Sequence, residues 1–128
     1  MITERKKNIL IVEDDGIQQI IMKRIAHRLG LNVLDVVSSG HKAVETAHSL
    51  PELDLIMMDV RLADEVDGIE AMKRIRQGLE SVKVIYVTGN SEKETRNRAV
   101  ETNYEAFLEK PVTEEDLKHA VSAAFAAL

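Results

Sequence analysis

The chain has 128 residues, of which 45% are hydrophobic and 30% charged, a composition typical of one globular domain rather than a disordered segment. Its net charge of −5 disfavours direct binding to nucleic acid, because phosphate contacts need clustered Lys and Arg. The absence of Cys excludes disulfides, thiol catalysis and Cys-ligated metal sites. No apolar run approaches the roughly 20 residues that span a bilayer, and no signal peptide is evident, so we expect a cytoplasmic protein without membrane contacts.

Short apolar runs alternate along the chain with segments of helical periodicity. Near-continuous apolar runs are typical of strands buried on both faces, as in a parallel sheet. We therefore predict a single domain over residues 1–128, with a short disordered segment at about 1–7. The five predicted strands are Asn8–Val12, Val33–Val37, Leu53–Met58, Val82–Val87 and Glu105–Leu108.

The segments between the strands carry apolar stripes and helix-start signals. In chain order, the stripes are Ile17, Ile20, Ile21, Ile25 and Leu29; then Ile69, Met72 and Ile75; then Leu117, Val121 and Phe125. An N-cap residue followed three positions later by an acidic or amide residue is typical of a helix start. Four such pairs occur: Asp15 with Gln18, Asp67 with Glu70, Ser91 with Glu94, and Thr113 with Asp116.

Five alternating strand–helix units predict an α/β fold with helices on both faces of the sheet and right-handed crossovers. The common five-stranded solution is the flavodoxin-like (βα)5 doubly wound fold, a parallel sheet of order 2-1-3-4-5. In that order the functional crevice lies at the carboxyl ends of strands 1 and 3.

Polar residues stand where the predicted strands end. Glu13 and Asp14 follow the first strand, Asp59 the third, Thr88 the fourth and Lys110 the fifth. Neighbouring strands lie about 4.8 Å apart, so these side chains would line one edge of the sheet. Carboxylates within about 5 Å repel by roughly 3 kcal/mol per pair at an effective dielectric near 20. An all-oxygen ligand set favours a hard cation, most naturally Mg²⁺, as the compensating charge.

Such an arrangement is suited to phosphoryl transfer. The Asp59 carboxylate can attack phosphorus to give an aspartyl phosphate. Mg²⁺ and Lys110 would neutralise the phosphoryl oxygens, and the Thr88 hydroxyl would donate a hydrogen bond to one of them.

Four segments, in this order and spacing, resemble the receiver domain of two-component response regulators over essentially the whole chain. They are Ile9-Leu10-Ile11-Val12-Glu13-Asp14-Asp15, Leu55-Ile56-Met57-Met58-Asp59, Val87-Thr88-Gly89 and Phe107-Leu108-Glu109-Lys110-Pro111. The resemblance implies that Asp59 is the phosphoacceptor and that Asp14 binds Mg²⁺ directly. It also implies that Glu13 acts largely through metal-bound water and that the backbone carbonyl of Arg61 completes the protein ligands.

The resemblance also implies a switch. Thr88 would move toward the phosphoryl group, and Lys110 would be the ion-pair partner of that group. Phe107 would be the aromatic residue that reports phosphorylation to the surface. Arg61 and Asn90 would tune the phosphoryl lifetime. The bond before Pro111 is expected to be cis.

The function implied is a phosphorelay module that receives its phosphoryl group from a histidine kinase or a histidine phosphotransfer protein. We expect a signalling switch that takes part in its own phosphorylation and autodephosphorylation, and no separate enzymatic activity. The downstream partner is not identified by the sequence. A homodimer through helix 4, strand 5 and helix 5 is one possibility, although charges on helix 4 are more commonly a solvated face.

Some residues depart from the family pattern. The loop after Asp59 is one residue longer than usual and has Ala63 in place of Pro, and Asp64 and Glu65 make it more acidic. We expect it to be less rigid, with effects on partner docking and phosphoryl lifetime. Asn103 replaces the usual Gly before strand 5 and tolerates the left-handed conformation. No output domain follows in this sequence, which fits a stand-alone receiver or a piece of a longer regulator or hybrid kinase.

Two other functions compete with this interpretation. A Mg²⁺-dependent phosphohydrolase resembling the haloacid dehalogenase superfamily would use similar groups, but its nucleophile lies in a DxD motif on the first strand, which is absent here. A receiver-like adaptor that is never phosphorylated is disfavoured by the complete residue set. A nucleotide-binding protein is less favoured because neither a GxGxxG nor a P-loop motif occurs. The four His residues (His27, His41, His48 and His119) lack ligand spacing and are expected at the surface.

Overall fold

The computed structural model describes residues 6–89 and 93–126. Five parallel strands form one sheet of order β2-β1-β3-β4-β5, as the sequence predicted. They are β1 (Asn8–Val12), β2 (Asn32–Val37), β3 (Leu55–Met58), β4 (Lys83–Thr88) and β5 (Ala106–Glu109). The predicted Ser91 helix cap, the lifetime residue Asn90 and residues 1–5 of the expected N-terminal segment lie outside the described residues.

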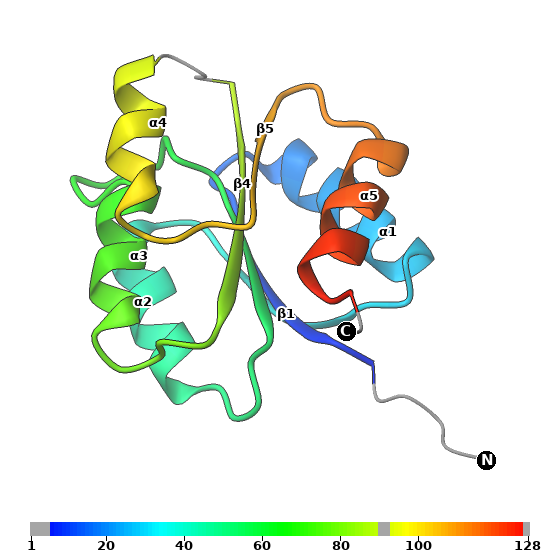
Figure 1. Cartoon of the computed structure of the whole chain (residues 1–128), viewed down its shortest axis with the longest axis horizontal. Coiled ribbons are helices and arrows are strands. Elements are labelled where there is room, and N and C mark those ends of the chain that lie inside the picture. Colours follow the sequence, from blue (N-terminus) through cyan, green and yellow to red (C-terminus); the bar gives the residue numbers. More distant parts are fainter. Residues whose placement is uncertain (1–5, 90–92, 127–128) are drawn as a thin grey trace.

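Helices cover both faces of the sheet. Figure 1 shows α1 and α5 on one side and α2, α3 and α4 on the other. Their bounds are α1 (Gly16–Arg28), α2 (Gly40–Ser49), α3 (Gly68–Arg76), α4 (Lys93–Val100) and α5 (Glu114–Ala124). Within the described ranges, no helix has the length and apolar character needed to cross a membrane.

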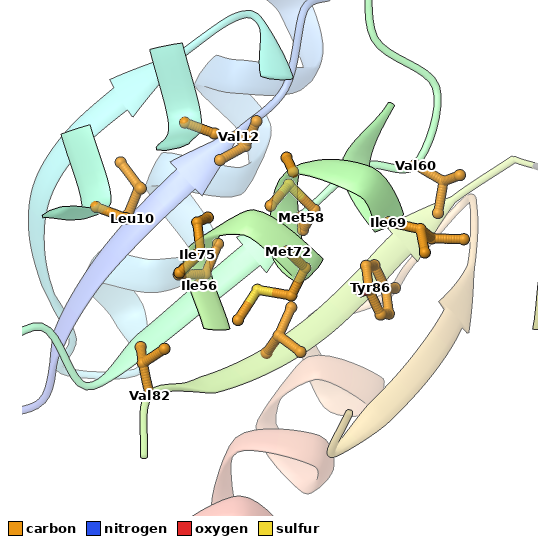
Figure 2. Close-up of a cluster of buried hydrophobic side chains, with 14 of the residues drawn as sticks. Leu10, Val12, Ile56, Met58, Val60, Ile69, Met72, Ile75, Val82 and Tyr86 are labelled. Carbon is orange, nitrogen blue, oxygen red and sulfur yellow. The ribbon is translucent and has the colours of Figure 1, made fainter. Parts of the chain in front are cut away.

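The three central strands are buried on both faces because each face has its own helical layer. Alternate residues of a strand point to opposite faces, so β1 contributes Leu10 to one core and Ile9 to the other. Figure 2 shows the first core, in which Ile56 and Tyr86 face Met72 of α3. The edge strands β2 and β5 are only partly buried. This double coverage holds the ends of the central strands in fixed positions.

Three of the predicted helix starts are confirmed. Asp15 accepts hydrogen bonds from the backbone N–H groups of Ile17 and Gln18 at the start of α1. Asp67 and Thr113 cap α3 and α5 in the same way. Ser39, which the sequence analysis did not single out, caps α2 through Lys42 N–H at 3.1 Å. The residue three positions after Ser39 is the basic Lys42, so the sequence carries no capping-box signal there.

The predicted apolar stripe of α1 is wrong for its N-terminal half. Ile17, Ile20 and Ile21 are 70%, 55% and 41% exposed. The helix instead packs on the sheet through Met22, Ile25 and Ala26. Both stripes have helical spacing, so periodicity alone cannot choose between them. The short side chain of the fully buried Ala26 lets this face lie close to the sheet.

The two faces of α1 give a matched test of this correction. We expect Ile25→Ala to lower the free energy of unfolding by about 2–4 kcal/mol, because it leaves a cavity in the core. We expect Ile20→Ala to change it by less than about 0.5 kcal/mol, because the side chain is largely solvated. Chemical denaturation measures both. Equal losses would contradict the observed orientation of α1.

Candidate functional site

The polar residues that end the strands gather at one edge of the sheet, as predicted. Glu13 and Asp14 directly follow β1, Asp59 follows β3, Thr88 is the last residue of β4, and Lys110 follows β5. The order of the sheet makes these four strands consecutive neighbours. The main chain joins the last two positions, since Lys110 N–H donates to the Thr88 carbonyl at 2.8 Å. The Thr88 side chain is fully buried.

Three carboxylates form the centre of the site. One carboxylate oxygen from each of Glu13, Asp14 and Asp59 lies within 4.8 Å of the others. Glu13 and Asp59 are buried, with exposed fractions of 3% and 6%, whereas Asp14 is exposed. Hard divalent cations prefer such oxygen donors, and Mg²⁺ is commonly bound by one or two carboxylates together with water. The residues present therefore fit Mg²⁺.

Lys110 supplies a positive charge to this cluster. Its Nζ donates to Glu13 Oε1 at 2.7 Å and to Asp59 Oδ2 at 3.0 Å. Burial lowers the pKa of Lys110, but the hydrogen bonds and charges of the two carboxylates outweigh it, and the net pKa is raised. The ammonium is therefore charged at neutral pH. Its contribution to stability is complete below the ordinary lysine pKa and is lost only as the pH rises through the raised value.

The backbone fixes the two buried carboxylates. The Glu13 side chain accepts a hydrogen bond from Asp15 N–H at 3.1 Å. The Asp59 side chain accepts one from Arg61 N–H at 3.3 Å, while Asp59 N–H donates to the Val12 carbonyl at 3.0 Å. Both acidic residues are thus held by the strand ends and by the turns that follow them.

Two residues that support the site were missed in the sequence analysis. Gln19 of α1 donates from Nε2 to the Glu13 carbonyl at 2.6 Å. Gly68 packs directly under the phosphoacceptor candidate, and a Cβ there would lie 2.1 Å from the Asp59 carbonyl oxygen. The sequence placed Gly68 at a helix start, because the preceding Asp67 was recognised as an N-cap. Its contact with Asp59 depends on how the loop folds back and is not encoded in a spacing.

The candidate switch residue Phe107 lies in an aromatic cluster. Its ring centroid is 5.6 Å from that of Tyr86 and 5.8 Å from that of Tyr104, and the Arg96 guanidinium of α4 lies 5.2 Å from the Phe107 centroid. Burial raises the pKa of Tyr86 to about 12. Its hydroxyl pairs with Thr102 Oγ1 at 2.8 Å, which ties β4 to the turn after α4. Phe107 therefore joins β5 to both β4 and α4.

The local departures near β5 behave as the sequence indicated. The Lys110–Pro111 peptide bond is cis. Asn103 has a φ of 53°, the left-handed conformation for which Asn is suited. The four His residues are all exposed. His41 nevertheless contacts Asp64 of the loop after Asp59, a pairing that the sequence did not reveal.

Comparisons with known proteins agree with this geometry. A family described as the response regulator receiver domain matches residues 9–122. Two-component response regulator 24 of Arabidopsis thaliana is 35% identical over 113 residues, which cover 88% of this chain and 79% of that protein. Response regulator protein VraR of Staphylococcus saprophyticus is 30% identical over 114 residues, again 88% of this chain. This match covers 54% of VraR, so the chain spans about half the length of that relative.

Solved structures show the same architecture. The signal receiver domain of a modulated diguanylate cyclase from Desulfovibrio desulfuricans superposes with a TM-score of 0.85 at 30% identity, covering 94% of each chain. The receiver domain of sensor histidine kinase PA1611 from Pseudomonas aeruginosa gives a TM-score of 0.84 at 27% identity, covering 96% of this chain and all of that one. That structure holds a magnesium ion in its active-site cleft. With its fold, its acidic site and a family match over most of its length, this chain belongs to the response regulator receiver domains.

Proposed function

We propose that Asp59 is the phosphoacceptor of this receiver domain and that a phosphohistidine protein, a histidine kinase or a histidine phosphotransfer protein, is the donor. One observation carries the proposal. The buried Asp59 carboxylate is held between an ammonium group 3.0 Å away and two further carboxylates whose oxygens lie within 4.8 Å. A nucleophile, a positive charge and a cation-binding oxygen set thus meet at one point.

The transfer moves one phosphoryl group between two proteins. A carboxylate oxygen of Asp59 attacks phosphorus, the P–N bond to the donor imidazole breaks, and the electron pair stays on the imidazole nitrogen. Lys110 would stay beside the product and neutralise a phosphoryl oxygen, and the Thr88 hydroxyl would donate to another. Attack of water on the acyl phosphate would return Asp59 to its starting state as autodephosphorylation.

Glu13, Asp14, Asp59 and the backbone carbonyl of Arg61 would hold Mg²⁺. When bound, this ion would supply positive charge that offsets the phosphoryl oxygens. Lys110 already occupies one side of the carboxylate cluster. The chain's own residues thus provide one fixed cation and a set of oxygen ligands for a second.

We assign the switch to Thr88 and Phe107, and the tuning of phosphoryl lifetime to Arg61 and Asn90. Thr88 lies at the end of β4, and Phe107 lies on β5 against Tyr86 of the same β4. A shift at Thr88 would therefore reach the face formed by α4, β5 and α5. Homodimerisation through this face stays a prediction.

The chemistry predicts a defined change in intact mass. After incubation with phosphoramidate and Mg²⁺, we expect the mass to rise by one phosphoryl group. The gain should disappear with a chelator and in Asp59→Asn, which keeps the shape of the side chain but lacks the nucleophilic carboxylate.

Two results would contradict this assignment. Labelling of Asp59→Asn would place the phosphoryl group elsewhere, and no labelling of the wild type would favour an unphosphorylated adaptor. Repeated turnover of a generic phosphomonoester would instead favour a phosphohydrolase.

Lys110 offers a second test of the site. We expect Lys110→Ala to lower the free energy of unfolding by about 1–3 kcal/mol without divalent ions, because Glu13 and Asp59 lose their shared counter-charge. Mg²⁺ should then raise the melting temperature more in this variant than in the wild type. Lys93→Ala on the exposed surface of α4 is the control with the same charge change. An equal response to Mg²⁺ in both variants would show that Lys110 does not compensate this cluster.

A protein donor would also need a contact surface beside the site. The exposed Ile17, Ile20 and Ile21 lie at the start of α1, which begins two residues after Asp14. Their apolar surface is available to a docked phosphohistidine protein, whereas a small-molecule donor would not touch it.

We therefore expect Ile17→Lys to slow transfer from a purified phosphohistidine protein that phosphorylates the wild type, by about 10-fold or more for loss of a central apolar contact. Labelling by phosphoramidate should stay unchanged. Val100→Lys is the matched control, because Val100 is 62% exposed on α4, on the other side of the sheet. A similar loss in both variants would rule out a specific contact at α1.

A further inference from the structure

The loop that follows Asp59 is fastened to α2 through one acidic side chain. Asp64 Oδ1 accepts a hydrogen bond from Gly40 N–H at 3.0 Å, and Oδ2 accepts one from His41 N–H at the same distance. Oδ2 also lies 2.6 Å from Nδ1 of the His41 ring, which donates to the ionised carboxylate. Asp64 thus satisfies two of the free N–H groups in the first turn of α2. Asp64, one of the two acidic residues of the longer loop, therefore has a defined structural position.

Close backbone packing accompanies these hydrogen bonds. Gly40 lies directly against the loop, and a Cβ at this position would be 2.0 Å from the Val66 carbonyl oxygen. The Val66 side chain is buried, and Gly68 N–H donates to the Val60 carbonyl at 2.8 Å. The apex of the loop is therefore attached to α2, and a backbone hydrogen bond joins the two ends of the loop at its base.

The base of this loop contacts the phosphoacceptor candidate. Arg61 N–H donates to Asp59 Oδ1 at 3.3 Å, and Gly68 packs on the Asp59 carbonyl. Asp64 lies between these two contacts in the sequence. Burial raises the pKa of Asp64, but its hydrogen bonds to the backbone of Gly40 and His41 outweigh this, and the net pKa is lowered. The carboxylate is therefore ionised at neutral pH and able to accept all three bonds.

We propose that Asp64 is a positioning residue for phosphoryl transfer, which fastens the loop after Asp59 to α2 so that the Arg61 backbone stays in place beside the Asp59 carboxylate. The proposal rests on the proposed function of Asp59. Asp64 is one of the residues by which this loop departs from the usual receiver pattern. Glu65, the next residue, is exposed and carries the same charge, so it separates the effect of hydrogen bonding from that of loop charge.

The test compares Asp64→Asn with Glu65→Gln in the full chain. Hydrogen–deuterium exchange of the segment 60–67, without divalent ions, should be faster in Asp64→Asn than in the wild type and unchanged in Glu65→Gln. Phosphorylation by phosphoramidate is then measured over a range of Mg²⁺ concentrations, well below the melting temperature of each variant. In Asp64→Asn the Mg²⁺ concentration for half-maximal rate should rise by about 10-fold, as is typical when a residue that orients metal ligands is lost. The maximal rate at saturating Mg²⁺ should change much less.

Each outcome decides the proposal. Equal Mg²⁺ dependence of Asp64→Asn and Glu65→Gln, in a wild type that is phosphorylated, overturns the role of Asp64 and leaves the function of Asp59 intact. Faster exchange without a change in Mg²⁺ dependence overturns it as well, because the loop would then move without affecting the site. A wild type that takes no phosphoryl group overturns both the proposed function and this inference.

Discussion

The site depends on holding three carboxylates together at the end of a buried sheet. Buried charges are costly unless they are paired and hydrogen-bonded. Glu13 and Asp59 meet this requirement by sharing Lys110 and by accepting hydrogen bonds from Asp15 and Arg61 N–H. Asp14 is exposed and keeps contact with water. The cluster is thus partly compensated by the protein, and its oxygen donors fit a further cation.

This electrostatic arrangement places demands on the fold. Glu13 and Asp59 must follow adjacent strands, β1 and β3, that end level with each other. Lys110 must follow β5, which is separated from β3 by β4. A parallel sheet covered on both faces supplies such fixed strand ends. The buried apolar residues of β1, β3 and β4 therefore serve the site indirectly, because they hold the frame to which its charged groups are attached.

The loop between β3 and α3 links the site to two helices. Asp64 binds the first turn of α2, whereas Asp67 caps α3 and also pairs with Arg98 of α4 at 2.9 Å. Within α4, Thr95 and Ala99 are the buried residues, and the rest of that helix is exposed. Elements with few buried contacts have low local stability and can change position at small cost. By this criterion α4 is a shallowly packed helix.

The sequence by itself determined the alternation of five strands with helices, three of the helix caps and the identity of the strand-end residues. These features depend on local chemistry, such as apolar runs, capping side chains and acidic residues after a strand. Glu13, Asp59, Thr88 and Lys110 could be placed together because parallel strands bring their carboxyl ends to a common edge. Their roles in transfer came from the family resemblance.

Only the tertiary structure decided which face of α1 is buried, how Gly68 supports Asp59 and where Asp64 binds. Helical spacing allowed either Ile20 or Met22 to face the sheet, and close packing selected Met22 and Ala26. The partners of Asp64 lie 23 and 24 residues away in the chain, at the start of α2. No local pattern encodes such contacts, because they exist only once the loop and α2 have been brought together by the folded sheet.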